Sequence, residues 1–247
     1  MRYGVIFIIL FLPFIFLSRY SIAQGHSSDS CMRQNSIDAV IDLYHKKQGT
    51  ASNLYNGVEV EPYNFIFFQS TPYFKDSSFI QGTVFYDKVK YKDVPLLYDL
   101  VHDELILLHF DRVHQINLVK EKVDSFYLSS HHFIKLNPDT SNTVIKGGYY
   151  DELYKGQVSL LMKRTKLAEE KIESGSIYLR ASAKSSFYLL KEGSYFRIKN
   201  KKDLLKMLSD KRNELNHYIR RNKIKFKSMP EIAMTSVVAH YDQLIKK

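Results

Sequence analysis

Five of the nine histidines in this chain lie within about thirty residues of one another, next to acidic side chains. They are His102, His109, His114, His131 and His132, and the acids beside them are Asp103, Glu104 and Asp111. Histidine and carboxylate side chains bind zinc and transfer protons in enzymes, so this stretch is the first place to look for chemistry.

The spacing of these histidines argues against one shared site. Residues 104–110 have the pattern of a strand, and at ~3.3 Å per residue it would hold His102 and His109 over ~20 Å apart. His131 and His132 are adjacent and would point to opposite faces of a strand. We therefore interpret the cluster as polar corners between strands.

One pair of histidines is less easily set aside. His109 and His114 flank one predicted turn and could meet near Asp111, which gives at most three ligands. We predict no metal site, no cofactor and no catalytic residue here. Coordinates that bring His109, His114 and another histidine or acid to one point would contradict this interpretation.

Signatures of nucleophilic catalysis are missing from the sequence. It has no Gly-x-Ser-x-Gly elbow and no glycine-rich phosphate loop. The carboxylate pairs Asp103–Glu104 and Asp151–Glu152 are adjacent, so they point apart and are poor acid–base partners. A hydrolase with a site assembled from distant strand ends is the alternative that this pattern leaves open.

The first residues predict export. An apolar run, Val5–Leu17, follows Arg2, and small residues precede a predicted cleavage after Ala23. A helix of that length rises only about 20 Å, too short for a ~30 Å hydrocarbon core. We expect a signal peptide at 1–23, a flexible leader at 24–35, and a periplasmic, envelope-associated or secreted protein. The single cysteine, Cys31, cannot form an internal disulfide.

Basic residues are concentrated near the C-terminus. Residues 184–227 contain fourteen Lys and Arg but only four Asp and Glu, which equals the formal charge of +10 of the whole chain. Such a segment is either a solvated helix face or a surface for an anionic envelope component or an acidic protein, and we do not expect nucleic acid as a partner of an exported protein. The residues predicted to bind an anionic surface are Lys201, Lys202, Lys206, Lys211, Arg212, Arg220, Arg221 and Lys223.

Residues 36–199 predict a β-rich domain that begins with a short helix over 35–49. Runs rich in Val, Ile, Phe and Tyr recur about every ten residues, separated by charged or glycine turns. Asn56–Gly57, Asp87–Lys88 and Glu192–Gly193 are predicted hairpin turns. The charged stretch 166–175 is predicted to be an excursion between strands.

Residues 200–247 predict two helices packed on this sheet. Asn200 is a good cap for the first, and Ser228 and Glu231 have capping-box spacing around Pro230 at the start of the second. The predicted class is α+β: an antiparallel meander of about eight to ten strands, curved or forming a partly open barrel, with one N-terminal and two C-terminal helices.

Four segments resemble a family of secreted proteins of Gram-negative bacteria that has no assigned activity. The segments are "DVPLLYDLVHDELIL", "EKVDSFYLSSHHFIKL", "GYYDELYKGQVSLLMKR" and "LLKMLSDKRNELNHYIRRNKIKF". The resemblance covers most of the mature chain but brings no catalytic residues with it.

The expected role is that of an exported binding or structural protein that is not a catalyst. A curved sheet with an apolar concave face would suit a carrier of an apolar ligand, by analogy of fold. An apolar chamber above a few hundred Å³ would favour the carrier, and carboxylates or histidines converging in a polar cleft would favour an enzyme. A scaffold that docks its basic helix on an anionic surface is the third possibility.

Overall fold

The computed structural model describes Ser36, Val40 and residues 53–137, 144–173 and 175–246. Contacts divide the chain into two units, Met1–Ile41 and Asp42–Lys247. The predicted signal peptide, the leader and most of the predicted N-terminal helix lie outside the described residues, but Ser36 and Val40 are helical. No helix in the described ranges is both long enough and apolar enough to cross a bilayer.

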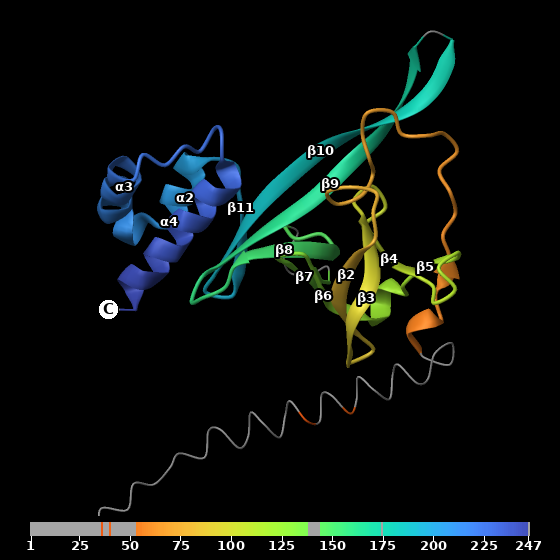
Figure 1. The fold of residues 1–247 in the computed structure, drawn as a ribbon. Helices are drawn as coiled ribbons and strands as arrows, with labels where there is room; N and C mark the ends of the chain where they lie inside the picture. The colour runs from red at the N-terminus through yellow and green to blue at the C-terminus, as the bar shows by residue number, and fades with distance from the viewer. Residues whose placement is uncertain (1–35, 37–39, 41–52, 138–143, 174, 247) are drawn as a thin grey trace, which may run out of the picture. The chain divides into compact units, whose positions relative to one another are not determined.

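Eleven strands form one sheet in which every pair of neighbouring strands is antiparallel (Figure 1). In chain order they are β1 (Val58–Glu59), β2 (Ile80–Tyr86), β3 (Val89–Asp99), β4 (Glu104–Leu108), β5 (Gln115–Asn117), β6 (Val123–Leu128), β7 (His131–Leu136), β8 (Gly148–Tyr154), β9 (Ser159–Glu173), β10 (Ser176–Lys191) and β11 (Ser194–Ile198). Across the sheet the order is β1-β5-β4-β3-β2-β6-β7-β8-β9-β10-β11, so the sheet has two open edges. The predicted α+β class is confirmed, with one strand more than expected.

Two of the three predicted hairpin turns are confirmed. Asp87 and Lys88 both have positive φ, 52° and 64°, and they join β2 to β3 as a tight turn that matches the twist of the strands. Glu192 and Gly193 likewise join β10 to β11. These turns were predictable because their conformation depends on two residues only.

The hairpin predicted at Asn56–Gly57 is wrong. The chain leaves the 3-10 helix η2 (Asn53–Tyr55) and enters β1, which pairs with β5, sixty residues further along. Gly57 is needed for another reason, since a Cβ on it would lie 2.1 Å from the carbonyl oxygen of Asn117. The glycine therefore allows two backbones to approach closely.

The predicted excursion at 166–175 is also wrong. Residues 166–173 of this stretch form the outer half of β9, which pairs with β10 along its whole length. Figure 1 shows this hairpin extending beyond the rest of the sheet. Residues 169–173 of β9 are all exposed, so no apolar alternation marks the end of this strand in the sequence.

Three α-helices close the chain: α2 (Lys201–Met207), α3 (Arg212–Arg221) and α4 (Pro230–Ile245). Asn200 caps α2 as predicted, its side chain accepting the amides of Lys202 and Asp203. The first predicted helix is divided by the 3-10 helix η4 (Ser209–Lys211). The capping box is wrong, because Met229 is the cap of α4 and no side chain caps it, while Pro230 does stand in the first turn.

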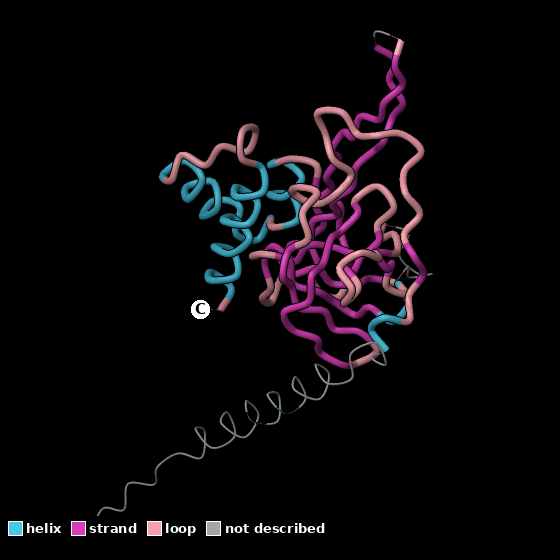
Figure 2. Tube along the Cα trace, turned by 45° about the vertical axis from the view of Figure 1, so that its right-hand side comes forward, coloured by secondary structure: helices cyan, strands magenta, loops and turns pink. Residues whose placement is uncertain are grey.

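The helices pack against one end of the sheet, as Figures 1 and 2 both show. Their core joins Leu189 and Ile198 of the strands to Leu204, Leu215 and Val237 of the helices. Each of these side chains is at most 2% exposed. Burial of this apolar surface fixes the helices on the sheet.

A second core, separate from the helices, is filled by aromatic rings. Tyr98 packs edge-to-face against Phe126, Phe133 and Tyr149, and all four side chains are at most 1% exposed. A chamber for an apolar ligand would need this space. The filled core therefore gives the carrier hypothesis no support in this part of the molecule.

A partly buried ionic network lies at the edge of this aromatic core. Asp103, with φ of 59° at the corner between β3 and β4, accepts the ammonium groups of Lys163 at 2.8 Å and Lys120 at 2.9 Å and the hydroxyl of Tyr98 at 2.6 Å. Gly148, with φ of 131°, makes room for it, since a Cβ there would lie 2.0 Å from Asp103 Oδ2. The network links β4 to β8 and β9.

Candidate functional site

The five clustered histidines do not form one site. His102 and His109 lie at opposite ends of β4, and His131 and His132 point to opposite faces of β7, as predicted. Each of the five instead has a carboxylate close to its own ring. The histidines are therefore spread over separate histidine–carboxylate groups.

One of these groups already contains a cation. The Nδ1 atom of His131 lies 2.7 Å from Asp151 Oδ2, and Glu231 of α4 lies close by. The guanidinium group of Arg164 bridges these two acids, 2.6 Å from Asp151 and 2.8 Å from Glu231. Because the guanidinium occupies the position that a metal ion would need, this group is a structural ion-pair network.

A second group sits on the turn between β4 and β5. His109 and His114 both lie within 3 Å of Asp111 Oδ2, so the turn predicted here is confirmed and its polar side chains also meet. His109, His114 and an acid therefore meet at one point, which by the condition stated above contradicts the interpretation of these three residues as polar corners alone.

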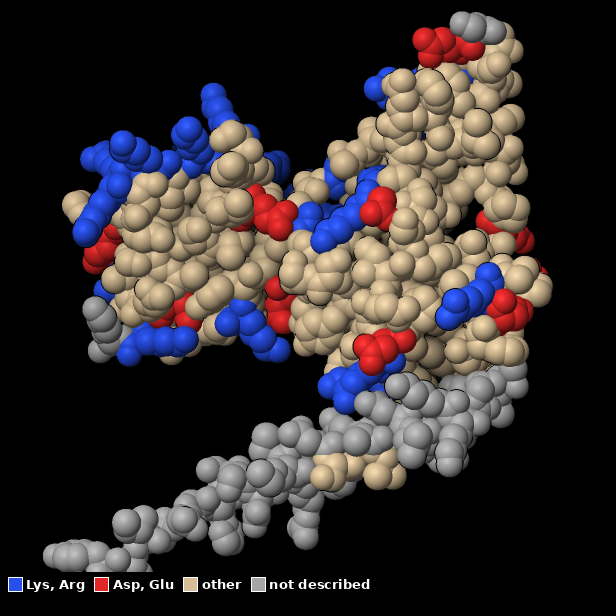
Figure 3. Space-filling model, in the orientation of Figure 1, with Lys and Arg blue, Asp and Glu red and all other residues tan. Residues whose placement is uncertain are grey.

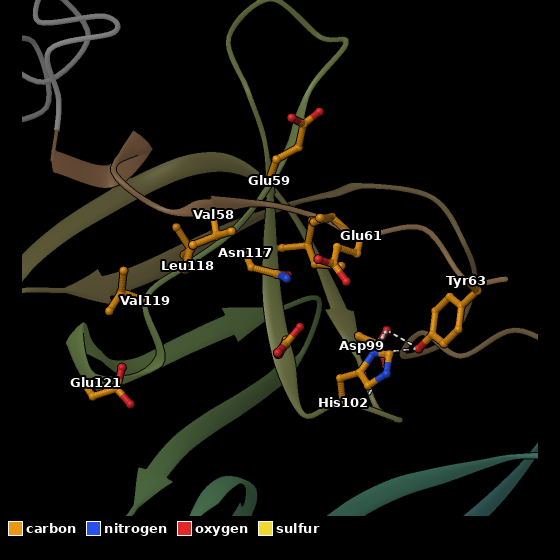
Figure 4. Close-up of a pocket in the computed structure, with 13 residues that line it drawn as sticks. Val58, Glu59, Glu61, Tyr63, Asp99, His102, Asn117, Leu118, Val119 and Glu121 are labelled. Atoms are coloured by element: carbon orange, nitrogen blue, oxygen red, sulfur yellow. Dashed lines mark hydrogen bonds and ion pairs between the residues drawn. The ribbon is translucent and has the colours of Figure 1, made fainter.

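The third group borders the pocket drawn in Figure 4, which lies beside the β1 edge of the sheet and has a volume of about 530 Å³. Volumes of this order are typical of sites for small ligands. Its lining combines acidic and apolar side chains with one tyrosine, one histidine and one asparagine. The lining residues are Val58, Glu59, Val60, Glu61, Tyr63, Asp99, His102, Glu104, Ile106, Asn117, Leu118, Val119 and Glu121.

Asp99 organises one wall of this pocket. It is 3% exposed, and its Oδ1 atom accepts the backbone amides of Val101 and His102 at the end of β3. Its Oδ2 atom accepts the hydroxyl of Tyr63 at 2.5 Å, and the ring of His102 stacks on Tyr63 with its Nδ1 atom 3.1 Å from that hydroxyl. Burial and the hydrogen bond to Asp99 raise the pKa of Tyr63, which therefore stays protonated as a donor.

Among the residues that the structure describes, the other four carboxylates of the pocket have no partner that would neutralise them. Within the described ranges, no ion pair or side-chain hydrogen bond reaches the carboxylate of Glu59, Glu61, Glu104 or Glu121. Asp103, the neighbour of Glu104 in the sequence, differs from these four acids because it forms ion pairs with two lysines. The pocket thus carries concentrated negative charge in a chain whose formal charge is +10.

One further feature suits a ligand with both a cationic and an apolar part. Val58, Val60 and Val119, which are exposed or half-buried, give the pocket accessible apolar surface between the acids. The Oδ1 atom of Asn117, another lining residue, accepts no hydrogen bond from the described residues, but it is buried and a ligand would reach it only after the side chain turned. Carboxylates and alkyl surface together match an alkylammonium group.

The side chains that could take part in catalysis in this pocket are carboxylates, one histidine and one tyrosine. Its lining contains no serine, threonine, cysteine or lysine nucleophile. The buried Asp99 is committed to two backbone amides and to Tyr63. Carboxylates and His102 nevertheless converge at this pocket, which is the feature named above as favouring an enzyme, so the alternative of a hydrolase stays open beside that of a binding protein.

Most of these pocket residues were not singled out in the sequence. Glu59 and Glu61 carried the clearest signal, because alternate positions of an extended "VEVEP" segment place both carboxylates on one side. Their meeting with Glu104 depends on β1 pairing with β5 and β5 with β4. That pairing has no local signature.

The eight basic residues predicted to bind an anionic surface lie along α2, η4, α3 and the residues that follow it. Six of them are exposed, whereas Lys201 and Lys211 are half-buried. Figure 3 shows Lys and Arg side chains gathered over the helical part of the molecule. The structure thus separates a basic helical surface from the acid-lined pocket at the β1 edge.

Comparison of the chain with family models, with curated proteins and with solved structures gives no match. Function therefore has to be argued from the pocket itself.

Proposed function

We propose that this protein is an exported, non-catalytic binding protein of the cell envelope that holds an alkylammonium ligand in the acid-lined pocket. The observation that carries the proposal is the set of four unpaired glutamates around one cavity. Like charges brought together at a recess repel one another, and a bound cation relieves that repulsion. The apolar run at Val5–Leu17 supports export.

The ligand class follows from the lining. An inorganic cation would gain nothing from the accessible apolar side chains Val58, Val60 and Val119, whereas the carbon chain of a polyamine or a lysine-like side chain would bury apolar surface against them. Tyr63 and His102 add a flat ring surface at one side, favourable to a cationic group.

Isothermal titration of the protein with spermidine tests this proposal. Changing Glu61, Glu104 and Glu121 together to glutamine is expected to weaken spermidine binding about tenfold, since each partly exposed ion pair contributes about 0.2–1 kcal/mol. Raised salt should weaken wild-type binding in the same direction. Glu59 is left unchanged because it also acts electrostatically on His114.

The matched control is Glu214→Gln, an exposed acid on α3 without an ion pair in the described residues. It should leave spermidine affinity unchanged. Removing the repulsion among the three pocket glutamates should also keep or slightly raise the unfolding midpoint of the triple variant without ligand. Equal affinity of the wild type and the triple variant, or binding of the neutral octane-1,8-diol as tight as that of spermidine, would refute the proposal.

A second candidate function, docking of the basic helices on an anionic surface, is favoured by the exposure of Arg212, Arg220 and Arg221. Changing Lys211, Arg212, Arg220 and Arg221 together to glutamine is expected to abolish retention on liposomes that contain phosphatidylglycerol, because each basic residue near such a surface contributes about 1 kcal/mol. Liposomes of phosphatidylcholine alone are the control. Retention that survives the four changes would remove this candidate.

A further inference from the structure

The turn between β4 and β5 brings three metal-ligand side chains together from six consecutive residues. The amide of His109 donates to the carbonyl of His114 at 2.8 Å, and the amide of Arg112 donates to the carbonyl of His109 at 2.9 Å. Arg112 has a φ of 60°, which closes the turn. His109 and His114 therefore face each other at the end of the ladder.

Asp111 is held between these histidines by the backbone. Its Oδ1 atom accepts the amides of Val113 at 2.8 Å and His114 at 3.1 Å, which fixes the direction of the carboxylate. Its Oδ2 atom lies 2.9 Å from the Nδ1 atom of His109 and 2.6 Å from that of His114. The potential ligand atoms of the three residues all lie within 4.8 Å of one another.

His109 provides an independent sign that the group is incomplete. Its side chain is 19% exposed and sits edge-on to Tyr55, with ring centroids 5.1 Å apart. Its Nδ1 atom is buried and makes no well-directed hydrogen bond within the described residues, although it lies 2.9 Å from Asp111 Oδ2 and interacts with that carboxylate strongly enough to help lower the pKa of Asp111. A buried polar atom normally has a partner, and a metal ion between the three side chains would provide one.

The group at the turn differs from the group of His131, Asp151 and Glu231 in the cation beside its carboxylate. At His131 and Asp151 the guanidinium of Arg164 supplies the positive charge. At Asp111 no lysine or arginine forms an ion pair within the described residues. The two groups have similar donor atoms, but within the described residues only the one at the turn has no lysine or arginine paired with its carboxylate.

We propose that His109, Asp111 and His114 form a binding site for a divalent transition metal ion, with Zn²⁺ as the best match. Two imidazole nitrogens and one carboxylate are a common zinc ligand set, and three protein ligands leave a coordination position for water or an external ligand. His114 and Asp111 border solvent, so that position is reachable. The backbone amides on Asp111 Oδ1 supply the outer support that orients a ligand.

This site is independent of the cation pocket, and its test uses different variants. Protein freed of metal is titrated with Zn²⁺ in competition with a chromophoric chelator, and Co²⁺ is used as a spectroscopic probe. One Zn²⁺ per chain is expected, with visible absorption bands of Co²⁺ in low coordination. Asp111→Asn, which can keep the amide contacts, and His114→Ala should each weaken Zn²⁺ binding about 100-fold or more.

His217→Ala, on the exposed face of α3, is the control and should bind Zn²⁺ like the wild type. Unfolding midpoints of all variants without metal separate loss of a ligand from loss of fold. Absence of stoichiometric Zn²⁺ binding in the wild type would overturn the proposal. So would Zn²⁺ binding that persists in both Asp111→Asn and His114→Ala, since the ion would then be bound elsewhere.

Discussion

Replacing Asp103 with alanine is expected to lower the free energy of unfolding by about 3–5 kcal/mol, because it leaves a buried ammonium group without its carboxylate. Lys163 is 13% exposed and lies 2.8 Å from Asp103, and its ammonium also donates to the carbonyl of Tyr149 at 3.0 Å and lies 5.1 Å from the centre of the Tyr150 ring. Burial lowers the pKa of Lys163, which identifies desolvation as the cost that Asp103 offsets. Urea denaturation measures the loss.

Two variants make this measurement specific. Asp124→Ala changes an exposed acid on β6 and should alter stability by less than about 0.5 kcal/mol. Adding Lys163→Met to Asp103→Ala removes the uncompensated charge, so the double variant should be more stable than Asp103→Ala alone. A loss below about 1 kcal/mol for Asp103→Ala would mean that the network does not hold β4 to β8 and β9.

Replacing Asp242 with alanine is expected to cost about 3 kcal/mol, because it removes the polar link between α4 and the turn that joins β8 to β9. Asp242 is fully buried and accepts the hydroxyl of Tyr154 at 2.9 Å and the amide of Gln157 at 2.7 Å, while Lys246 pairs with it. The lost acceptor would leave Tyr154 and Gln157 unsatisfied. Thermal unfolding of Asp242→Ala beside that of the wild type tests this.

The same carboxylate predicts how stability depends on pH. Burial opposes its charged form, but the hydrogen bonds from Lys246, Tyr154 and the amides outweigh burial and lower the pKa of Asp242 below its ordinary 3.8. Because the pKa is lowered, the folded state binds a proton at Asp242 less readily than the unfolded state does. The contribution of the ionised Asp242 to the free energy of unfolding is therefore complete above pH 3.8, and it is lost as the pH falls through the pKa of the folded state. Asp242→Asn should therefore unfold with less pH dependence than the wild type below about pH 4. Identical acid profiles would contradict the assignment.

The sequence predicted features that depend on neighbouring residues. Asp87 and Lys88 form their turn because a two-residue hairpin needs only two positive φ angles, and Asn200 caps α2 through amides two and three residues away. It failed at Asn56–Gly57, where the glycine permits contact with Asn117. The local sequence does not distinguish a glycine that forms a hairpin turn, such as Gly193, from one that lets two backbones approach, such as Gly57.

The same division applies to the sites. His109, Asp111 and His114 lie within one turn, so the sequence could predict that their side chains meet. Only the structure shows that the Nδ1 atom of His109 is buried without a well-directed hydrogen bond. The acid-lined pocket joins Glu61 to Glu104 across a strand pairing between distant segments. A register of that kind is set by the packing of the whole sheet.

Titration of nitrogen-15-labelled protein with spermidine, followed by amide chemical shifts, tests most directly whether the acid-lined pocket binds cations. Saturable shifts are expected at β1, at Glu104 in β4 and at Glu121, with little change along α2 and α3. Shifts that do not saturate, or that spread evenly over the exposed acids of the chain, would contradict a specific site in this pocket.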